Sequence, residues 1–383
     1  MKKNKNLLKY MPTFAFCVII FVIPILYFAI KDSDFSTLEK RKLSQFPKPT
    51  VETVFNGKFG KDFETYLNDQ MPLRTFFVGT NAYYDQISGR NGMNGIYNAK
   101  DNYLMVTPVE DNPTLENNIK YIGEFIDGID TKTYICVVPT SGYIYDSKLP
   151  SNHYDYNDEK IIDKIENSFT NVDNTEFINL IDNFKSLSKS EQLYYKTDHH
   201  WTALGAYECY KILGEKMRFT PTPQDSFEVE SYDGFYGTNY SKSALWFTPG
   251  ETLEIWDNNN RPEGSIKMYI NEGGEVTISD KLFFRENLDT NDQYTAYLDG
   301  NHAMVTIQNE NADSDKKLLI LRDSYSHCLA PFLTDNYSEI VLIDVRYYLN
   351  PVSDIVREQG IDEILILYSL DSIVNSTDIA GIF

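Results

Sequence analysis

The sequence places two histidines side by side in Asp198-His199-His200-Trp201, next to a carboxylate and a tryptophan. The whole chain has only five histidines and three tryptophans, so this stretch concentrates scarce side chains. A carboxylate beside an imidazole forms a general base near neutral pH, because the carboxylate orients one ring nitrogen and stabilises the imidazolium. Asp198 and His200 are the predicted pair. Adjacent residues usually point in different directions, so His199 is predicted to be structural.

A base needs a nucleophile to activate, and Ser324 is the strongest candidate in the chain. It follows a buried strand predicted at 316–321 and precedes a predicted helix. Such a turn exposes a hydroxyl at the carboxyl edge of a sheet, and the backbone N–H groups at the start of a helix can stabilise an oxyanion. Serine at this position is also a common helix N-cap, so the turn alone does not identify a nucleophile.

Two other interpretations of the histidine pair stay open on sequence alone. In the first, the imidazoles form a hydrogen-bonded wall of a buried turn, and Thr202 caps the helix that follows. In the second, Asp-His-His binds manganese, as in one class of phosphoesterases. Those sites need additional aspartate motifs, and this sequence has none at suitable places. We therefore predict that the site holds no metal ion and no cofactor.

Residues 197–202, together with Arg322-Asp323-Ser324-Tyr325-Ser326, resemble the DHHW protein family, which is similar to the SGNH-hydrolase-like alginate O-acetyltransferases. The resemblance extends over nearly the whole chain beyond the N-terminal apolar segment. It includes Glu39, Arg41, Leu43, Pro47, Asp69-Gln70, Pro72-Leu73-Arg74 and Asn81. By this resemblance Asp198 is the orienting acid, His200 the base and Ser324 the nucleophile. Trp201 is then a packing residue, and His199 occupies the variable position of an Asp-x-His-Trp motif.

The sequence shows no clear equivalent of the separate oxyanion-hole blocks of the acetyltransferases. Gly237 and Asn239 are the candidates, and a surface β-turn is an equal alternative for both. Other side chains are predicted to line the cleft because they follow predicted strands, where α/β proteins bind ligands. These residues are Tyr325, Arg346 and Tyr347, with structural packing as the alternative for all three, and Asp323 is a further supporting residue.

Helices alternate with short apolar strands from about residue 114 onward, which predicts an α/β sandwich around a parallel sheet. The predicted strands are 133–138, 176–180, 316–321, 340–344 and 363–368, and the predicted helices include 115–129, 161–168 and 203–217. Residues 220–312 break the alternation and predict a β-rich insertion beside the site. With the resemblance, residues 111–383 are expected to form an SGNH-hydrolase-like three-layer sandwich. An N-terminal region at 31–110 is expected to pack on it, with two helices interrupted at Pro72.

Lysines in residues 1–10 precede an uncharged stretch at 11–30. Twenty residues at about 1.5 Å each span roughly 30 Å, the thickness of a bilayer core. Basic residues before this stretch and acidic ones after it predict a single-pass plasma-membrane anchor with a cytoplasmic N-terminus and an extracytoplasmic body. A cleaved signal peptide is the alternative, but Ala29-Ile30-Lys31-Asp32-Ser33 is a poor cleavage site.

Composition limits the function classes further. The 383 residues are 42% hydrophobic and 24% charged, as in globular proteins, and the net charge of -21 argues against nucleic acid as a partner. The four cysteines lack metal-ligand spacing and are predicted to be small apolar residues. A disulfide between Cys136 and Cys209 is compatible with the sequence but not required by it.

The combined prediction is an O-acetyltransferase that acts on a cell-surface or secreted polysaccharide through an acyl-enzyme at Ser324. A membrane-bound acyltransferase is the expected partner that supplies the acetyl group. One alternative is a carbohydrate acetylesterase with the same triad. The other is a non-catalytic glycan-binding or scaffold protein of the cell envelope, in which Ser324 would stand far from His200.

Overall fold

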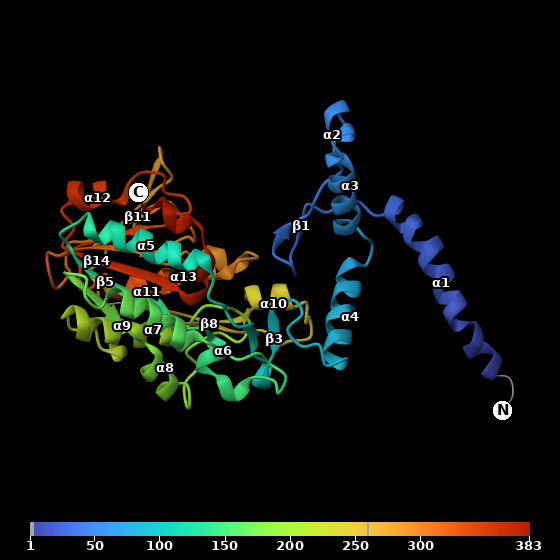
Figure 1. Ribbon diagram of the computed structural model, residues 1–383, viewed down its shortest axis with the longest axis horizontal. Coiled ribbons are helices and arrows are strands. Elements are labelled where there is room, and N and C mark those ends of the chain that lie inside the picture. The colour runs from blue at the N-terminus through green and yellow to red at the C-terminus, as the bar shows by residue number, and fades with distance from the viewer. Residues whose placement is uncertain (1–3, 259) are drawn as a thin grey trace. The chain divides into compact units, whose positions relative to one another are not determined.

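The computed structural model describes residues 4–258 and 260–383, and its elements are labelled in Figure 1. The chain forms two compact units. The first comprises Met1–Ser88 with Ala244–Trp246, and the second comprises Gly89–Ser243 with Phe247–Phe383. Residues 89–110, which the sequence assigned to the N-terminal region, therefore fold with the second unit.

The first unit is mostly helical. Its helix α1 (Asn4–Ala29) contains Lys9–Ala29, the one helix in the described part of the chain that is long and apolar enough to cross a membrane. Length and composition alone support this candidate span, so the anchor and its orientation stay predictions. A short β1 (Phe35–Ser36) pairs with β2 (Arg41–Lys42), and α2 (Val51–Phe55) follows.

The predicted helix break at Pro72 is confirmed. Helix α3 (Lys58–Asp69) ends before it, α4 (Arg74–Ile87) begins after it, and Leu73 between them has a left-handed φ of 60°. An ion-pair network ties this corner to β2. The Arg41 guanidinium donates to both Asp69 oxygens at 2.5 and 3.0 Å and to Glu39 at 2.8 Å, and Arg74 pairs with Glu39. The hydrogen bonds from Arg41 lower the pKa of Asp69 to about 2.

The second unit is built on an eight-stranded sheet in the order β10-β9-β11-β13-β12-β14-β5-β6. Five neighbouring strands are parallel, and they match the five predicted strands within a few residues. They are β5 (Lys132–Val138), β6 (Thr175–Ile178), β12 (Lys317–Arg322), β13 (Glu339–Ile343) and β14 (Glu363–Ser369).

The prediction for residues 220–312 is wrong in one respect, because part of this segment belongs to the central sheet. Its strands β9 (Ile266–Asn271), β10 (Val276–Ser279) and β11 (Met304–Asn309) extend the parallel strands in antiparallel fashion, so the sheet is mixed. The remaining strands, β7 (Glu228–Phe235) and β8 (Glu251–Asp257), form a separate antiparallel ribbon. A third pair, β3 (Ile96–Asn98) and β4 (Leu104–Val106), precedes the sheet in the chain.

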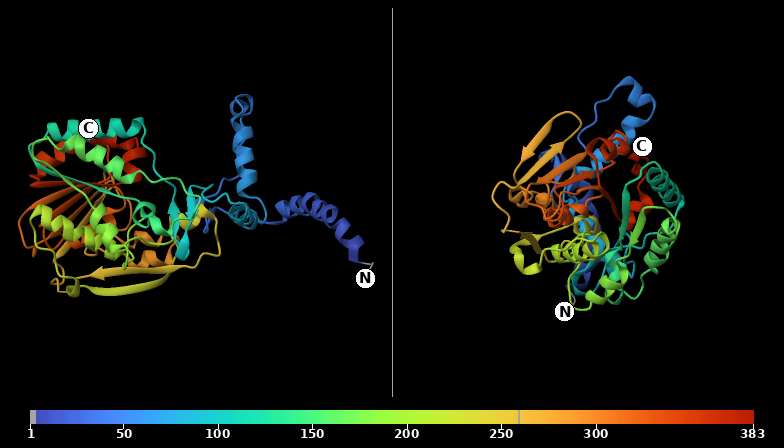
Figure 2. Two further views of the ribbon diagram at one scale, coloured as in Figure 1. Left: turned by 60° about the horizontal axis from the view of Figure 1, so that its bottom comes forward. Right: turned by 90° about the vertical axis from the view of Figure 1, so that its left-hand side faces the viewer.

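Helices cover both faces of the sheet, as Figure 2 shows. Successive strand residues face opposite sides, and in β12 Leu318 and Ile320 join one core whereas Leu319 and Leu321 join the other. The first core includes α6 (Ser141–Ile144), α8 (Ile181–Leu187), α9 (Ala203–Met217) and α11 (Ser326–Leu333). The second includes α5 (Pro113–Asp127), α7 (Asp158–Phe169), α12 (Val352–Gln359) and α13 (Leu370–Asn375). The predicted helices at 115–129, 161–168 and 203–217 are confirmed.

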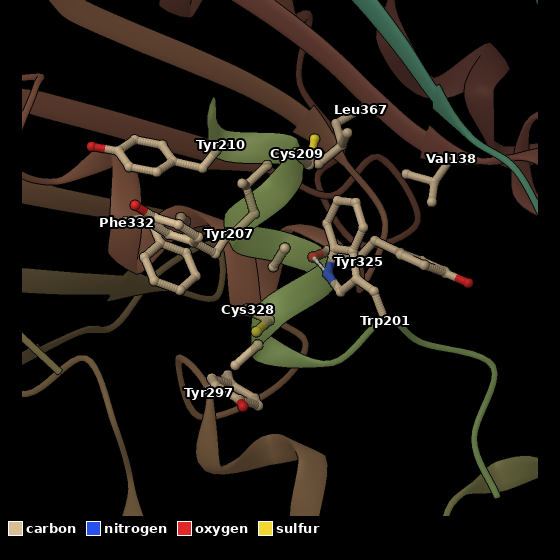
Figure 3. Packing of buried hydrophobic residues seen from close by; sticks show 14 of the residues in the cluster. Val138, Trp201, Tyr207, Cys209, Tyr210, Tyr297, Tyr325, Cys328, Phe332 and Leu367 are labelled. Atoms are coloured by element: carbon tan, nitrogen blue, oxygen red, sulfur yellow. Dashed lines mark hydrogen bonds between the residues drawn. The ribbon is translucent and has the colours of Figure 1, made fainter. Parts of the chain in front are cut away.

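The cysteines behave as small apolar residues in this fold. All four are free thiols, and Cys136, Cys209 and Cys328 are buried. Figure 3 shows Cys209 of α9 beside Leu367 of the sheet, and Cys328 of α11 near Tyr297.

Strand order creates a crevice at the carboxyl end of β12. The chain leaves β12 for β13 on one side and then crosses over to β14 on the other side. Connections that diverge in this way leave an opening at the carboxyl edge, which is where open α/β sheets bind ligands. The turn that carries Ser324 starts at this edge.

Asp158, at the start of α7, is fully buried and supports a stability prediction. Its Oδ2 accepts the Thr140 N–H at 2.7 Å and the Thr140 hydroxyl at 2.6 Å, whereas its Oδ1 has no hydrogen-bond partner among the described residues. Burial raises the pKa of Asp158 to about 6. A raised carboxyl pKa contributes stability that is complete below the unfolded value and is lost as pH rises through the folded value.

We expect Asp158→Asn to keep an oxygen that accepts hydrogen bonds from Thr140. Because asparagine does not ionise, the variant should not lose stability as pH rises through the pKa of Asp158. Between about pH 4 and about pH 8, chemical denaturation should show the free energy of unfolding of the variant gaining about 1–2 kcal/mol on wild type. The exposed Asp155→Asn is the matched control and should follow wild type. A constant difference between Asp158→Asn and wild type across this range would contradict the assignment.

Candidate active site

The structure brings Asp198, His200 and Ser324 into one hydrogen-bonded chain. His200 Nε2 lies 2.7 Å from Ser324 Oγ, and His200 Nδ1 lies 2.6 Å from Asp198 Oδ1. The Asp198 and His200 side chains are almost completely buried. The large separation expected for a non-catalytic protein of this fold is therefore not observed.

Ser324 occupies the turn between β12 and α11. Helix α11 begins at Ser326 with Tyr325 as its N-cap, so Ser324 is not the N-cap of this helix. The Asp323 carboxylate holds the turn by accepting the Tyr325 N–H at 3.0 Å and the Ser369 N–H, at the end of β14, at 2.8 Å. The serine is thus fixed to two neighbouring strands of the sheet.

The histidines lie in a tight turn that leads into α9. Tyr195 donates its N–H to the His200 carbonyl at 3.1 Å, and Tyr194 pairs with Trp201 across the turn. Trp201 is fully buried, as its predicted packing role requires, and its Nε1 donates to the Tyr325 carbonyl at 3.1 Å (Figure 3). Thr202 caps α9 by accepting the N–H of Gly205, as the alternative interpretation of a buried turn also expected. Trp201 therefore links the turn that carries His200 to the turn that carries Ser324.

The Asp198 carboxylate is saturated with donors. Its Oδ1 accepts the His200 N–H at 2.9 Å as well as the ring Nδ1, and its Oδ2 accepts the Thr238 N–H at 2.6 Å. Burial raises the pKa of Asp198, but the adjacent imidazoles and the hydrogen bonds from His200 outweigh it, so the pKa lies well below its ordinary value. Asp198 is therefore an anion at neutral pH.

Glu251, at the start of β8, holds the turn from behind. Its Oε1 accepts the N–H and hydroxyl of Thr197, both at 2.6 Å, and its Oε2 accepts the Lys196 N–H at 2.8 Å. Glu251 was not predicted from the sequence, and no local signal marks it because it lies 54 positions from Thr197.

Two rings enclose the His200 imidazole. Tyr294 stacks on one side, with ring centroids 3.9 Å apart and an interplanar angle of 6°. His199 lies at 3.8 Å with an angle of 37°. Tyr294, which was not predicted either, belongs to a short helix, η5 (Gln293–Ala296), in the segment predicted as an insertion.

A pocket of about 150 Å³ opens beside Ser324. It is formed by loops that follow β5, β12, β13 and β14, together with residues of the histidine turn and of α10 (Thr238–Ser243). Asp323, Tyr325, Arg346 and His199 line it, as does Lys242. Arg346 is paired with Asp344 at 2.6 Å. Tyr347 does not line this pocket and is half exposed, so its contacts do not support the predicted cleft role.

Gly237 and Asn239 do not line the pocket either, and their contacts give no support to the oxyanion-hole prediction. The Gly237 N–H donates to Thr197 Oγ1 at 3.1 Å, and a Cβ at this position would overlap Asp198. Asn239 is fully buried, and its Nδ2 donates to the Leu104 carbonyl at 2.8 Å. Gly237 instead packs against Asp198, and Asn239 instead joins α10 to β4.

Asp198, His199 and His200 also meet the geometric requirement for a metal site, because one ligand atom from each lies within 4.8 Å of the others. The Asp198 oxygen and the His200 Nδ1 are already hydrogen-bonded to each other. A metal ion there would compete with the contact that orients His200. The arrangement is therefore better suited to proton transfer from Ser324.

A mixed α/β unit with a hydroxyl–imidazole–carboxylate chain at the carboxyl edge of its sheet defines the class of this protein. The chain belongs to the DHHW protein family, whose domain matches residues 131–343. The probable alginate O-acetylase AlgJ of Pseudomonas syringae pv. tomato is 26% identical over 191 residues. That match covers 45% of this chain and 46% of AlgJ, so it spans about half the length of the curated relative.

Solved structures share the fold. A DHHW family protein from Eubacterium siraeum is 23% identical with a TM-score of 0.64, and the match covers 76% of this chain and 95% of that one. Bacillus cereus PatB1 with a sulfonyl adduct is 18% identical with a TM-score of 0.62, over 74% of this chain and 97% of that one. At these identities the likeness shows the fold alone.

We expect Gly237→Ala to displace Asp198, because the added methyl group meets both its side chain and its backbone. A shift of this kind should lower kcat/KM for p-nitrophenyl acetate about 10- to 100-fold. Gly274→Ala is the control, since nothing lies within 4 Å of a Cβ there. If Gly237→Ala retained full activity, the contact between Gly237 and Asp198 would have no part in positioning the base.

Tyr294 supports a separate prediction. Its hydroxyl is buried without a hydrogen-bond partner among the described residues, so Tyr294→Phe should keep the stacked ring and keep activity. Tyr294→Leu removes the aromatic contact and should lower kcat about three- to tenfold. Steady-state kinetics with p-nitrophenyl acetate measure both. Equal losses in the two variants would mean that the hydroxyl, not the stacked ring, is what matters.

Proposed function

We propose that this protein is an SGNH-hydrolase-like O-acyltransferase that transfers a short acyl group to a polysaccharide. The observation that carries this proposal is the unbroken hydrogen-bonded chain from Ser324 through His200 to Asp198. Membership of the DHHW family and the similarity to an alginate O-acetylase support the reaction class. Ser324 is the nucleophile, His200 the general base and Asp198 the group that orients the base.

In the first half-reaction His200 Nε2 takes the proton of Ser324 as Oγ attacks the carbonyl carbon of the acyl donor. The bond from this carbon to the donor oxygen then breaks, and the donor oxygen leaves with the proton from His200. In the second half-reaction a sugar hydroxyl gives its proton to His200 and attacks the acyl-Ser324 carbon. Ser324 leaves and recovers the proton. Asp198, anionic throughout, stabilises the imidazolium in both halves.

The oxyanion formed in each half needs donors that the predicted Gly237 and Asn239 do not supply. The backbone N–H of Ser324 donates no hydrogen bond to any residue in the described ranges. An amide on the nucleophile itself stands close to the carbonyl that its hydroxyl attacks. We assign this N–H as one oxyanion donor.

The pocket volume favours a short acyl group. This volume is about 150 Å³. Pockets for drug-sized ligands occupy roughly 300–1,000 Å³, so a sugar chain would remain largely outside. An acetyl group with the hydroxyl-bearing edge of an acceptor sugar suits this space. A membrane anchor at residues 11–30 and a membrane-bound acyltransferase that loads Ser324 complete the proposal.

Ser324→Ala should abolish both acetyl release from p-nitrophenyl acetate and acetylation of a glycan acceptor, with a fall in kcat of about 10⁴-fold or more. The exposed Ser168→Ala is the control and should behave as wild type. Acetate and acetylated glycan are measured in the same reaction. Unchanged turnover in Ser324→Ala would contradict the mechanism, whereas Ser324-dependent release of acetate with no glycan product would favour the carbohydrate acetylesterase.

A further inference from the structure

His199, which the triad chemistry does not use, is the second imidazole beside Asp198. Its Nδ1 lies 2.6 Å from Thr238 Oγ1 and 3.3 Å from Asp198 Oδ1. Its carbonyl accepts the hydroxyl of Tyr325, which links it to the serine turn. His199 is therefore held by contacts on both its ring and its backbone. About a third of its side chain is exposed, compared with 6% of the His200 side chain.

The contacts of Nδ1 indicate which nitrogen of His199 carries the proton. A carboxylate oxygen can only accept, and the Thr238 hydroxyl oxygen can accept as well, so a proton on Nδ1 serves both neighbours. Nε2 is then left as an unprotonated acceptor. Desolvation and the charges of His200 and Lys242 lower the pKa of His199, so the ring stays neutral near pH 7.

The Nε2 atom of His199 is accessible from the pocket. This atom has no hydrogen-bond partner in the described ranges, and it is not buried. His199 lines the pocket beside Ser324. Both imidazoles turn Nδ1 towards Asp198 and their ring centroids are 3.8 Å apart. The site thus presents two neighbouring imidazoles, one to Ser324 and one to the pocket.

Resting on the proposed acyl transfer, we propose that the acceptor is a sugar with two hydroxyls on adjacent ring carbons, and that His199 binds the hydroxyl that does not react. One hydroxyl gives its proton to His200 and attacks the acyl carbon. Its neighbour keeps its proton and donates a hydrogen bond to His199 Nε2. No proton passes through His199, and the bonds made and broken are those of the second half-reaction.

This assignment explains why a polysaccharide hydroxyl can compete with water for the acyl-enzyme. Water has a single oxygen and cannot occupy the positions beside both imidazoles at once. A hydrogen bond within a pocket adds about 0.5–1.5 kcal/mol, or about three- to tenfold in rate when it is made in the transition state. His199 is in this account a residue that selects and positions the acceptor.

The test uses the full-length protein and three small alcohols of similar size. Acyl-Ser324 is formed with p-nitrophenyl acetate, and the burst of p-nitrophenol counts active sites. Its decay is then followed with trans-1,2-cyclohexanediol, trans-2-methoxycyclohexanol or trans-1,3-cyclohexanediol at equal concentrations. The methoxy compound lacks the second donor, and the 1,3-diol separates its two hydroxyls.

In wild type the 1,2-diol should accelerate decay about three- to tenfold more than either comparison alcohol. His199→Phe keeps a ring beside His200 but has no acceptor, so the preference for the 1,2-diol should disappear, with each decay rate normalised to the burst that the variant gives. His199→Gln restores an acceptor and should recover part of it. Equal decay with all three alcohols in wild type, including no acceleration by any, would overturn the inference, as would a preference that survives in His199→Phe.

These outcomes separate the inference from the proposed function. A burst that requires Ser324, together with equal decay for the three alcohols, leaves the acyl-enzyme intact and removes only the role of His199. Absence of a Ser324-dependent burst in wild type removes the proposed function. A burst lost in His199→Phe but kept in His199→Gln would assign His199 to acylation and contradict its selective role in transfer.

Discussion

One buried carboxylate, that of Asp198, is the constraint on which the site depends. An anion with so little access to water is tolerable only where donors surround it, and here they come from the following turn and from the start of α10. The backbone N–H of His200 and that of Thr238 supply fixed dipoles, and the imidazole supplies the third donor. The hydrogen bonds that stabilise the Asp198 carboxylate therefore also fix the His200 imidazole, which must reach Ser324.

The sheet supplies the other half of the geometry. Because β12 lies between β13 and β14, its carboxyl end opens into a crevice. The turn between β12 and α11, which carries Ser324, lies at this crevice. Trp201 and Tyr325 join this turn to the histidine turn by two hydrogen bonds between side chains and carbonyls. The 2.7 Å distance between His200 Nε2 and Ser324 Oγ, which lie 124 positions apart in the chain, is thus fixed by packing in the core.

Local patterns predicted the elements, and long-range pairing decided what they could not. Helix α9 has the predicted bounds because Thr202 caps it and its apolar spacing is regular. The β-rich character of residues 220–312 was predicted, but the sheet that β9 and β11 join is set by partners distant in sequence. The roles of Glu251 and Tyr294 in the site could not be predicted for the same reason, since an isolated glutamate or tyrosine carries no motif. The contacts of the oxyanion candidates give them no support, because Gly237 packs against Asp198 and the Asn239 amide donates to the Leu104 carbonyl.

The central claim is that Ser324 carries the acyl group. It is tested most directly by mixing the protein with p-nitrophenyl acetate, quenching within one turnover and locating the acetyl group by peptide mass spectrometry. The account predicts acetyl on Ser324 in wild type, its disappearance when a glycan acceptor is added, and a matching gain of acetyl on the glycan. Continued turnover with no acetyl on Ser324, or with acetyl on another side chain, would contradict it.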